Sequence, residues 1–137
     1  MNILVTGGAG YIGSHTVRAL AAEKDFTPVV FDNLATGHAE SVPEGVTLVK
    51  GDIHDTDFVA ETLKKYDISG VIHFAAYSLV GESMVDPAKY YNNNVEGTLH
   101  LLEGMRKAGV DKIVFSSTAA VYGEPEKTPI EEDFPHN

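Results

Sequence analysis

The sequence predicts an α/β protein in which helices cover both faces of a parallel, doubly wound sheet. Short apolar runs recur along the 137 residues, and stretches with helical spacing separate them. The runs are continuous rather than alternating, which is typical of strands buried on both faces of a parallel sheet. Because strand and helix alternate, the crossovers are expected to be right-handed. The expected strands are residues 3–5, 29–31, 46–49, 71–75 and 113–115.

Three segments between these strands are expected to be helical. Residues 11–24 are rich in alanine and long side chains. Residues 55–66 begin with Asp55, a residue type that caps helices, and carry apolar side chains at helical spacing. The longest helix is expected over residues 87–108, because a proline opens it and Gly109 follows it.

The last part of the chain has a different composition. Residues 124–137 contain three prolines and five acidic residues, which predict an irregular acidic tail. We therefore expect residues 1–123 to form the folded domain and residues 124–137 to lead away from it.

Composition narrows the possible partners and the compartment. The formal net charge is −10, with 20 acidic residues against 10 basic ones, so a nucleic-acid partner is not expected. The chain has no cysteine, which suits a reducing compartment and excludes disulfides and thiolate metal ligands. No signal peptide or membrane-length apolar run is found, and the histidines have no metal-ligand spacing. We expect a cytoplasmic protein without a metal, and His73 is expected to be a packed core histidine.

A glycine-rich segment, TGGAGYIG at residues 6–13, joins the first expected strand to the first expected helix. Gly7, Gly10 and Gly13 permit a tight turn, a close approach of backbone to a pyrophosphate, and close packing of helix on strand. Free amides at the helix N-terminus bind phosphates, so even an acidic chain can hold a dinucleotide. The second strand ends at Asp32, whose carboxylate is expected to bind the ribose hydroxyls and favour NAD over NADP. The alternative is that Asp32 only stabilises a turn.

Together these segments resemble the extended short-chain dehydrogenase/reductase family, and within it the UDP-glucose 4-epimerases. The resemblance implies a Rossmann-like sheet with strand order 3-2-1-4-5, incomplete relative to the family, that binds NAD. It covers the whole chain and rests on TGGAGYIG (6–13), FDNL (31–34), GDI (51–53), VIHFAA (71–76), VGES (80–83), YYNNNVEGT (90–98) and FSSTAAVYG (115–123).

The resemblance also implies which residues contact the cofactor. For Asp52 the alternative is a turn, and for Ala75 and Ala76 it is ordinary strand-end packing. For the asparagine run at 92–94, unusual in a helix, the alternative is a buried hydrogen bond. The residues implied to contact NAD are Gly7, Gly10, Tyr11, Ile12, Gly13, Asp32, Asn33, Leu34, Thr36, Gly37, Asp52, Ile53, Phe74, Ala75, Ala76, Tyr77, Ser78, Asn93 and Ser116.

One catalytic contact is implied within the chain, and another group is missing. The hydroxyl of Thr118 is implied to contact the reacting sugar oxygen, although it could instead satisfy a backbone group. Ala119 and Ala120 stand where the related dehydratases carry acids, so dehydration is not expected. The family's proton-handling tyrosine lies four residues before a lysine, and none of the six tyrosines here has lysine at that spacing. We therefore expect an N-terminal part of a longer enzyme, inactive by itself.

The function implied by the resemblance is reversible epimerisation at carbon 4 of UDP-glucose and UDP-galactose. Hydride passes from the sugar to NAD and returns to the other face of a 4-keto intermediate. The implied partners are a UDP-sugar and a second copy, bound through the helix at about 87–108; alternatively that helix's apolar residues face the sheet. Two other functions stay open: a different nucleotide-sugar epimerase or decarboxylase, and a non-catalytic dinucleotide-binding module.

Overall fold

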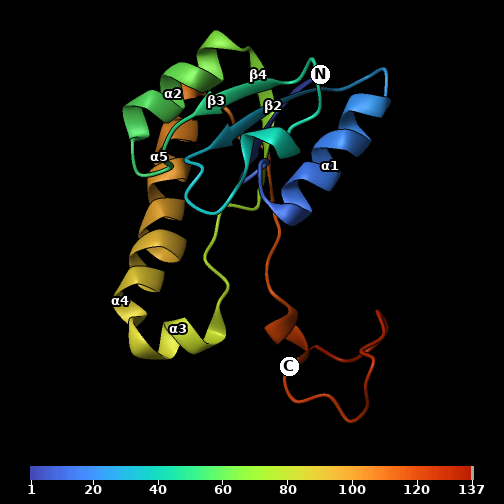
Figure 1. The fold of residues 1–137 in the computed structure, drawn as a ribbon. Helices are drawn as coiled ribbons and strands as arrows, with labels where there is room; N and C mark the ends of the chain where they lie inside the picture. The colour runs from blue at the N-terminus through green and yellow to red at the C-terminus, as the bar shows by residue number, and fades with distance from the viewer. Residues whose placement is uncertain (137) are drawn as a thin grey trace.

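The computed structural model describes residues 1–136, which form a parallel sheet with helices on both faces (Figure 1). The strand order is β3-β2-β1-β4-β5, and every neighbouring pair is parallel. This confirms the predicted fold class and strand order. The strands in the described residues are β1 (Asn2–Thr6), β2 (Thr27–Asp32), β3 (Thr47–Lys50), β4 (Ile68–His73) and β5 (Ile113–Phe115).

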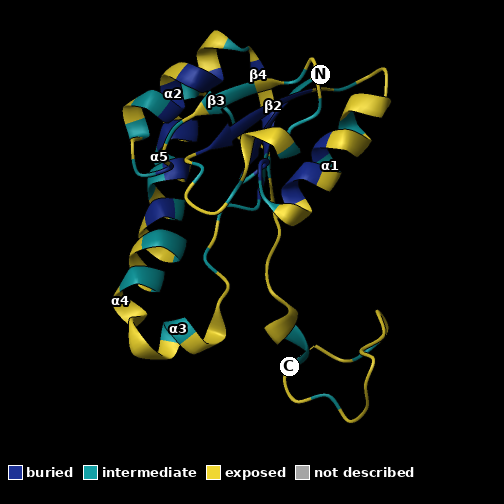
Figure 2. Cartoon of the chain, in the orientation of Figure 1, coloured by how far each residue is buried: buried dark blue, intermediate teal, exposed yellow. Residues whose placement is uncertain are grey.

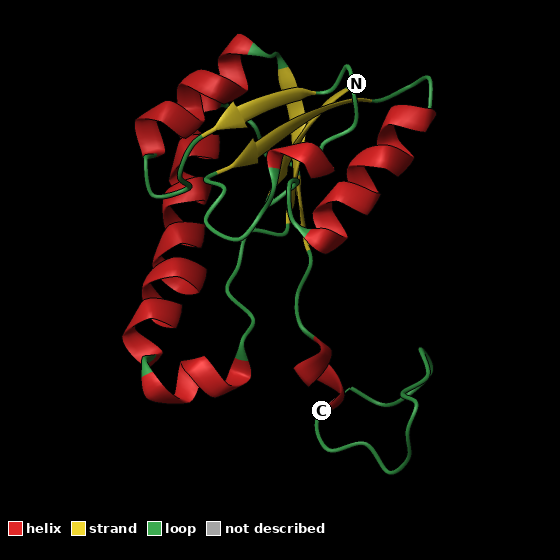
Figure 3. Ribbon diagram, viewed as in Figure 1, coloured by secondary structure: helices red, strands yellow, loops and turns green. Residues whose placement is uncertain are grey.

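The helices connect these strands and the loops around their carboxyl ends (Figure 3). The short helix α3 was missed from the sequence, because it has too few residues to show a helical period. The helices in the described residues are α1 (Tyr11–Ala22), η1 (Ala39–Ser41), α2 (Thr56–Lys65), α3 (Val80–Val85), α4 (Pro87–Tyr90), η2 (Tyr91–Glu96), α5 (Gly97–Ala108) and η3 (Ala119–Tyr122).

Local chemistry explains two helix ends that the sequence predicted. The side chain of Asp55 accepts a hydrogen bond from the amide of Phe58 at 3.0 Å and so caps α2. At the end of α5, Gly109 adopts a left-handed conformation with φ 76°. A glycine at this position carries no Cβ penalty, so the helix stops there.

The helix expected over residues 87–108 is confirmed, since α4, η2 and α5 follow one another without a break from Pro87 to Ala108. The segment η2 is a π-helix, and the amide of Gly97 donates to the carbonyl of Asn92, five residues earlier. The helix is therefore not a regular α-helix over the asparagine run. Asparagine is a poor helix former, and π-turns within helices are frequent at functional sites.

The two faces of the sheet have separate cores (Figure 2). On one face Leu4 and Phe31 pack with Leu63 of α2 and Leu101 of α5. The helices α2 and α5 can approach closely because Gly104 has no side chain. A Cβ at Gly104 would lie 2.6 Å from a methyl carbon of Val59. These contacts fix α5, and with it η2, against the sheet.

The opposite face is covered by α1, which packs against β1 and β2 and leaves residues of β5 exposed. Val17 of α1 packs against Val5 of β1 and Val30 of β2. At the edge strand β5, Val114 is 62% exposed and Phe115 is 57% exposed. Burial of every strand on both faces was therefore a wrong prediction for β5, an edge strand beside β4 of which Ile113 packs against the first core.

Beyond β5 the chain leaves the sheet (Figure 1). Residues 124–136 contain neither helix nor strand. The last residue of the expected tail, Asn137, lies outside the described residues. The division into a domain at 1–123 and a tail at 124–137 stays a prediction.

Candidate cofactor-binding site

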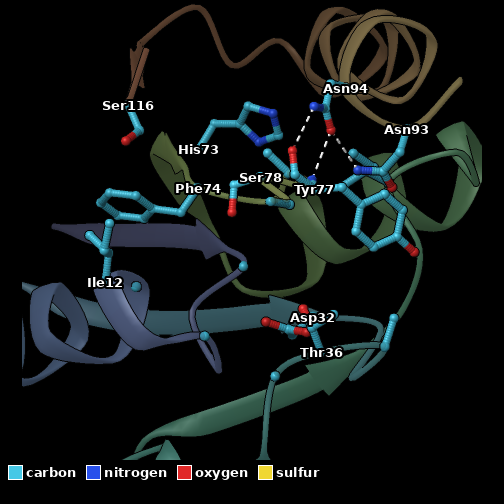
Figure 4. A pocket seen from close by; sticks show the side chains of 18 of the residues that line it. Ile12, Asp32, Thr36, His73, Phe74, Tyr77, Ser78, Asn93, Asn94 and Ser116 are labelled. Atoms are coloured by element: carbon cyan, nitrogen blue, oxygen red, sulfur yellow. Dashed lines mark hydrogen bonds between the residues drawn. The ribbon is translucent and has the colours of Figure 1, made fainter. Parts of the chain in front are cut away.

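A cavity of about 810 Å³ opens at the carboxyl ends of the strands, where the order reverses between β1 and β4 (Figure 4). Ligands of doubly wound proteins bind at such a switch point. The structure brings most of the expected contact residues together on its walls. They are Gly7, Gly10, Tyr11, Ile12, Gly13, Asp32, Asn33, Thr36, Gly37, Ile53, Phe74, Ala75, Ala76, Tyr77, Ser78, Asn93, Ser116 and Thr118.

The glycine loop (residues 6–13) forms the floor between β1 and α1. Gly7 has φ 71°, and a Cβ there would lie 2.6 Å from the backbone nitrogen of Ala75. A Cβ at Gly13 would collide with the carbonyl oxygen of Gly7 and lie 2.8 Å from the Cα of Gly8. Gly10 caps α1 without a side-chain hydrogen bond. The loop therefore holds its backbone open toward the cavity, with the first amides of α1 at its wall.

Asp32 sits at the end of β2 and is only 8% exposed. Its Oδ2 accepts from the amide of Ala9 at 3.0 Å, and its Oδ1 accepts from the amide of Leu34 at 2.9 Å. The carboxylate thus joins the glycine loop to the loop after β2, as the turn alternative required. A carboxylate has about four acceptor sites, so about two remain for a ligand.

Asp52 and Leu34 do not line the cavity, unlike the other residues implied to contact NAD. Asp52 instead accepts hydrogen bonds from the side chain of Asn33 at 3.0 Å and from the ring of His54 at 2.6 Å. Burial raises the pKa of Asp52, but the hydrogen bonds from His54 and Asn33 outweigh it and hold the pKa below its ordinary value. Burial lowers the pKa of His54, but its bonds to Asp52 and the Asn92 carbonyl raise it overall.

The residues 74–78, here called the β4 loop, form a wall of the cavity that begins beside Gly7 of the glycine loop. The prediction that this strand continues to Ala75 was wrong, because β4 ends at His73 and Ala75 packs against the backbone of Gly7. The side chain of Asn94 accepts from the amide of Tyr77 and donates to its carbonyl, each at 2.9 Å (Figure 4). Asn93 donates to the Asn94 side chain and reaches the cavity.

The end of β5 supplies hydroxyl groups. Ser116, Ser117 and Thr118 line the cavity, and Ser117 has the strained φ of 57°. The Oγ1 of Thr118 accepts from the amide of Ala120 at 3.1 Å, so it does satisfy a backbone group. Its hydroxyl proton remains available for donation, since that bond uses only an acceptor lone pair.

His73 at the end of β4 is 3% exposed, which confirms it as a core histidine. Burial lowers its pKa from 6.5 to about 4, so the ring is neutral at neutral pH. It also lines the cavity, as do other residues that were not among the implied contacts. They are Phe31, Ala35, Gly51, Val80, Ser83, Tyr90, Asn94, Thr98, Phe115 and Ser117.

Among residues 1–136, no group of three or more histidine or acidic side chains is arranged so that it could hold a metal ion. Within the same residues, no helix has the length and apolar character needed to cross a membrane.

Comparison with known proteins decides the family. The sequence profile of the "NAD dependent epimerase/dehydratase family" matches residues 3–137. The chain belongs to this family. It is 52% identical over 135 residues to UDP-glucose 4-epimerase of Lacticaseibacillus casei, covering 98% of this chain and 40% of that protein. It is 53% identical over 133 residues to the Streptomyces lividans enzyme of the same name, covering 96% of this chain and 40% of that protein.

A solved structure agrees with this family assignment. The crystal structure of UDP-glucose 4-epimerase from Brucella ovis in complex with NAD matches with a TM-score of 0.87 and 50% identity. The match covers 99% of this chain and 41% of that one. This chain therefore spans about 40% of the length of the relatives it matches.

Proposed function

We propose that this chain binds NAD in the cavity between β1 and β4. The observation that carries the proposal is the glycine loop, where a Cβ at Gly7 would meet the backbone of Ala75 and a Cβ at Gly13 would meet the backbone of Gly7 and Gly8. Such crowding at a helix N-terminus leaves backbone amides as the phosphate ligands. The NAD complex of the Brucella ovis relative supports the same cofactor.

Each wall of the cavity has a proposed task. The first amides of α1, at Tyr11 and Ile12, hold the pyrophosphate. The remaining acceptor sites of Asp32 bind the ribose hydroxyls and repel a 2′-phosphate. The small side chains of Ala75 and Ala76 let the middle of the cofactor lie close to backbone. The other residues implied by the resemblance keep their proposed contacts where they line the cavity.

We propose further that the longer protein is a UDP-glucose 4-epimerase, as its relatives are named. NAD, when bound, supplies a hydride acceptor for carbon 4 of the sugar. Thr118 lies at the same cavity, and its hydroxyl donates to the reacting sugar oxygen. Since none of the tyrosines is followed by lysine four residues on, this chain alone does not remove the sugar's proton.

UDP-galactose conversion tests this assignment. We expect no turnover by the 137-residue chain, because positioned acids and bases contribute about 10²–10⁴-fold and substrate orientation contributes more. We expect turnover by a hybrid in which the remaining part of the Lacticaseibacillus casei enzyme follows residue 137. The variant Thr118→Val in that hybrid should lose about 10²-fold in kcat. A folded, NAD-loaded hybrid without activity would contradict the epimerase assignment.

We also propose that two copies associate through η2 and α5. The apolar side chains on this surface are exposed, so they do not face the sheet, contrary to the alternative interpretation of the sequence. An exposed apolar stripe of this kind marks an interface. Analytical ultracentrifugation at high protein concentration tests this association, and a chain that sediments only as a monomer would contradict it. The exposed apolar residues of this surface are Tyr91, Val95, Leu99 and Leu102.

A further inference from the structure

A network of buried and half-buried hydrogen bonds links the ends of β1 and β4 to η2 and α5. The Nδ1 of His73 lies 2.6 Å from the hydroxyl of Thr6, and its Nε2 lies 3.1 Å from the hydroxyl of Thr98. The hydroxyl of Thr98 lies 2.7 Å from the carbonyl oxygen of Asn94. We call these four residues the His73 network.

The hydrogen atoms in the His73 network have one consistent arrangement. A carbonyl oxygen can only accept, so the hydroxyl of Thr98 donates its proton to Asn94. Its oxygen must then accept from His73, which places the ring proton on Nε2. The Nδ1 of the neutral ring is left as an acceptor for the hydroxyl of Thr6. Every polar atom of the buried ring is therefore satisfied, and no charged partner is needed.

The far end of this network is the residue that holds the β4 loop. Asn94 makes two hydrogen bonds to the backbone of Tyr77, one in each direction. Its own carbonyl lies in the π-turn, where the regular helix pattern is broken. The bond from Thr98 satisfies that carbonyl and fixes the backbone from which the Asn94 side chain extends.

We propose that His73 and Thr98 are positioning residues that act through Asn94 to set the conformation of the β4 loop. The π-turn orients Asn94 toward Tyr77, and His73 orients Thr98 toward the carbonyl of Asn94. The network thus holds one wall of the cavity in the shape that accepts the central part of NAD. That this shape accepts NAD rests on the proposed function, whereas the effect of His73 and Thr98 on the loop conformation does not depend on it.

Two measurements on the 137-residue chain test it. Amide hydrogen exchange of Tyr77 is measured without NAD, and NAD affinity is measured by calorimetric titration. The variant Thr98→Val keeps the side-chain shape and removes the hydroxyl. We expect amide exchange at Tyr77 to become about tenfold faster and the Kd for NAD to rise about tenfold. A tenfold change is of the size that interactions between hydrogen-bonded neighbours produce. Thr98→Ser keeps a hydroxyl and should restore both values.

The chain offers a matched control. Thr56 on α2 has its hydroxyl 2.9 Å from the ring of His100, outside the cavity lining. Thr56→Val therefore removes a threonine–histidine bond of the same kind and should leave Tyr77 exchange and NAD affinity unchanged. In an Asn94→Ala background, Thr98→Val should produce no further change at Tyr77, because the route to the loop is already cut.

The outcomes separate the two proposals. Wild-type exchange at Tyr77 in Thr98→Val, or equal effects of Thr98→Val with and without Asn94, would overturn the positioning role. If the wild-type chain binds no NAD while Tyr77 responds as expected, the proposed cofactor function falls and the loop-positioning role stands.

Discussion

The glycine loop and the β4 loop line one cavity, and different interactions fix their conformations. The glycine loop can adopt its conformation because Gly7 and Gly13 have no side chains, which would collide with backbone atoms. The β4 loop is shaped by side chains, since Asn94 holds the backbone of Tyr77 and His73 supports Asn94 through Thr98. At Gly13 the steric determinant is local in sequence, because the colliding atoms belong to Gly7 and Gly8, whereas at Gly7 they belong to the β4 loop. The hydrogen bonds that shape the β4 loop join residues up to 67 positions apart, as between Thr6 and His73.

The comparison predicts that the glycine loop tolerates a single methyl group least at Gly13. In Gly13→Ala the new Cβ would meet the carbonyl of Gly7 and the Cα of Gly8, both of them backbone. We expect the free energy of unfolding to fall by about 3 kcal/mol, the upper range for overpacking, in urea denaturation.

Gly10→Ala is the matched control for this effect. A Cβ there has one close contact, 3.2 Å from the carbonyl oxygen of Gly7. It should cost less than about 1 kcal/mol of stability. Equal destabilisation by the two variants would show that steric crowding at Gly13 does not shape the loop.

The β4 side of the comparison predicts a pH dependence from His73. Its pKa is about 4 in the folded chain against 6.5 as the ordinary value, so the unfolded chain binds more protons between these pH values. Stability should therefore be complete above about pH 6.5 and fall by about 3 kcal/mol as the pH falls to about 4. Urea denaturation of the wild type and of His73→Gln across this range isolates the contribution.

His73→Gln removes the titrating ring, so the stability difference between the two proteins should shrink as the pH falls. Other groups, such as Asp52 and His54, titrate in both proteins and cancel in the difference. Parallel stability curves for the two proteins would contradict the assignment of a buried, neutral His73.

The sequence predicted the glycine-loop side of the site better than the β4 side. The spacing of Gly7, Gly10 and Gly13 and the position of Asp32 follow from local patterns that a strand–loop–helix unit requires. The two hydrogen bonds from Asn94 to Tyr77 could be anticipated only from the asparagines, which are unusual in a helix. The sequence does not indicate which residue these asparagines bind. The partners of His73 depend on how α5 packs on the sheet, and no local pattern reports that packing.

The same distinction applies to the fold. The helix ends at Asp55 and Gly109 follow from capping, the strand order was implied by the family resemblance, and the structure has all of them as expected. The exposure of β5 and the π-turn at η2 could not be predicted in that way. Both depend on which surfaces lie next to each other in space.

Calorimetric titration of the 137-residue chain with NAD and with NADP tests the central claim most directly. The buried carboxylate of Asp32 bridges the two loops at the cavity and leaves about two acceptor sites for ribose hydroxyls. A 2′-phosphate would bring like charge against it. The account predicts that NAD binds at least about tenfold more tightly than NADP. Equal affinity for the two cofactors, or no binding of either by the folded chain, would contradict it.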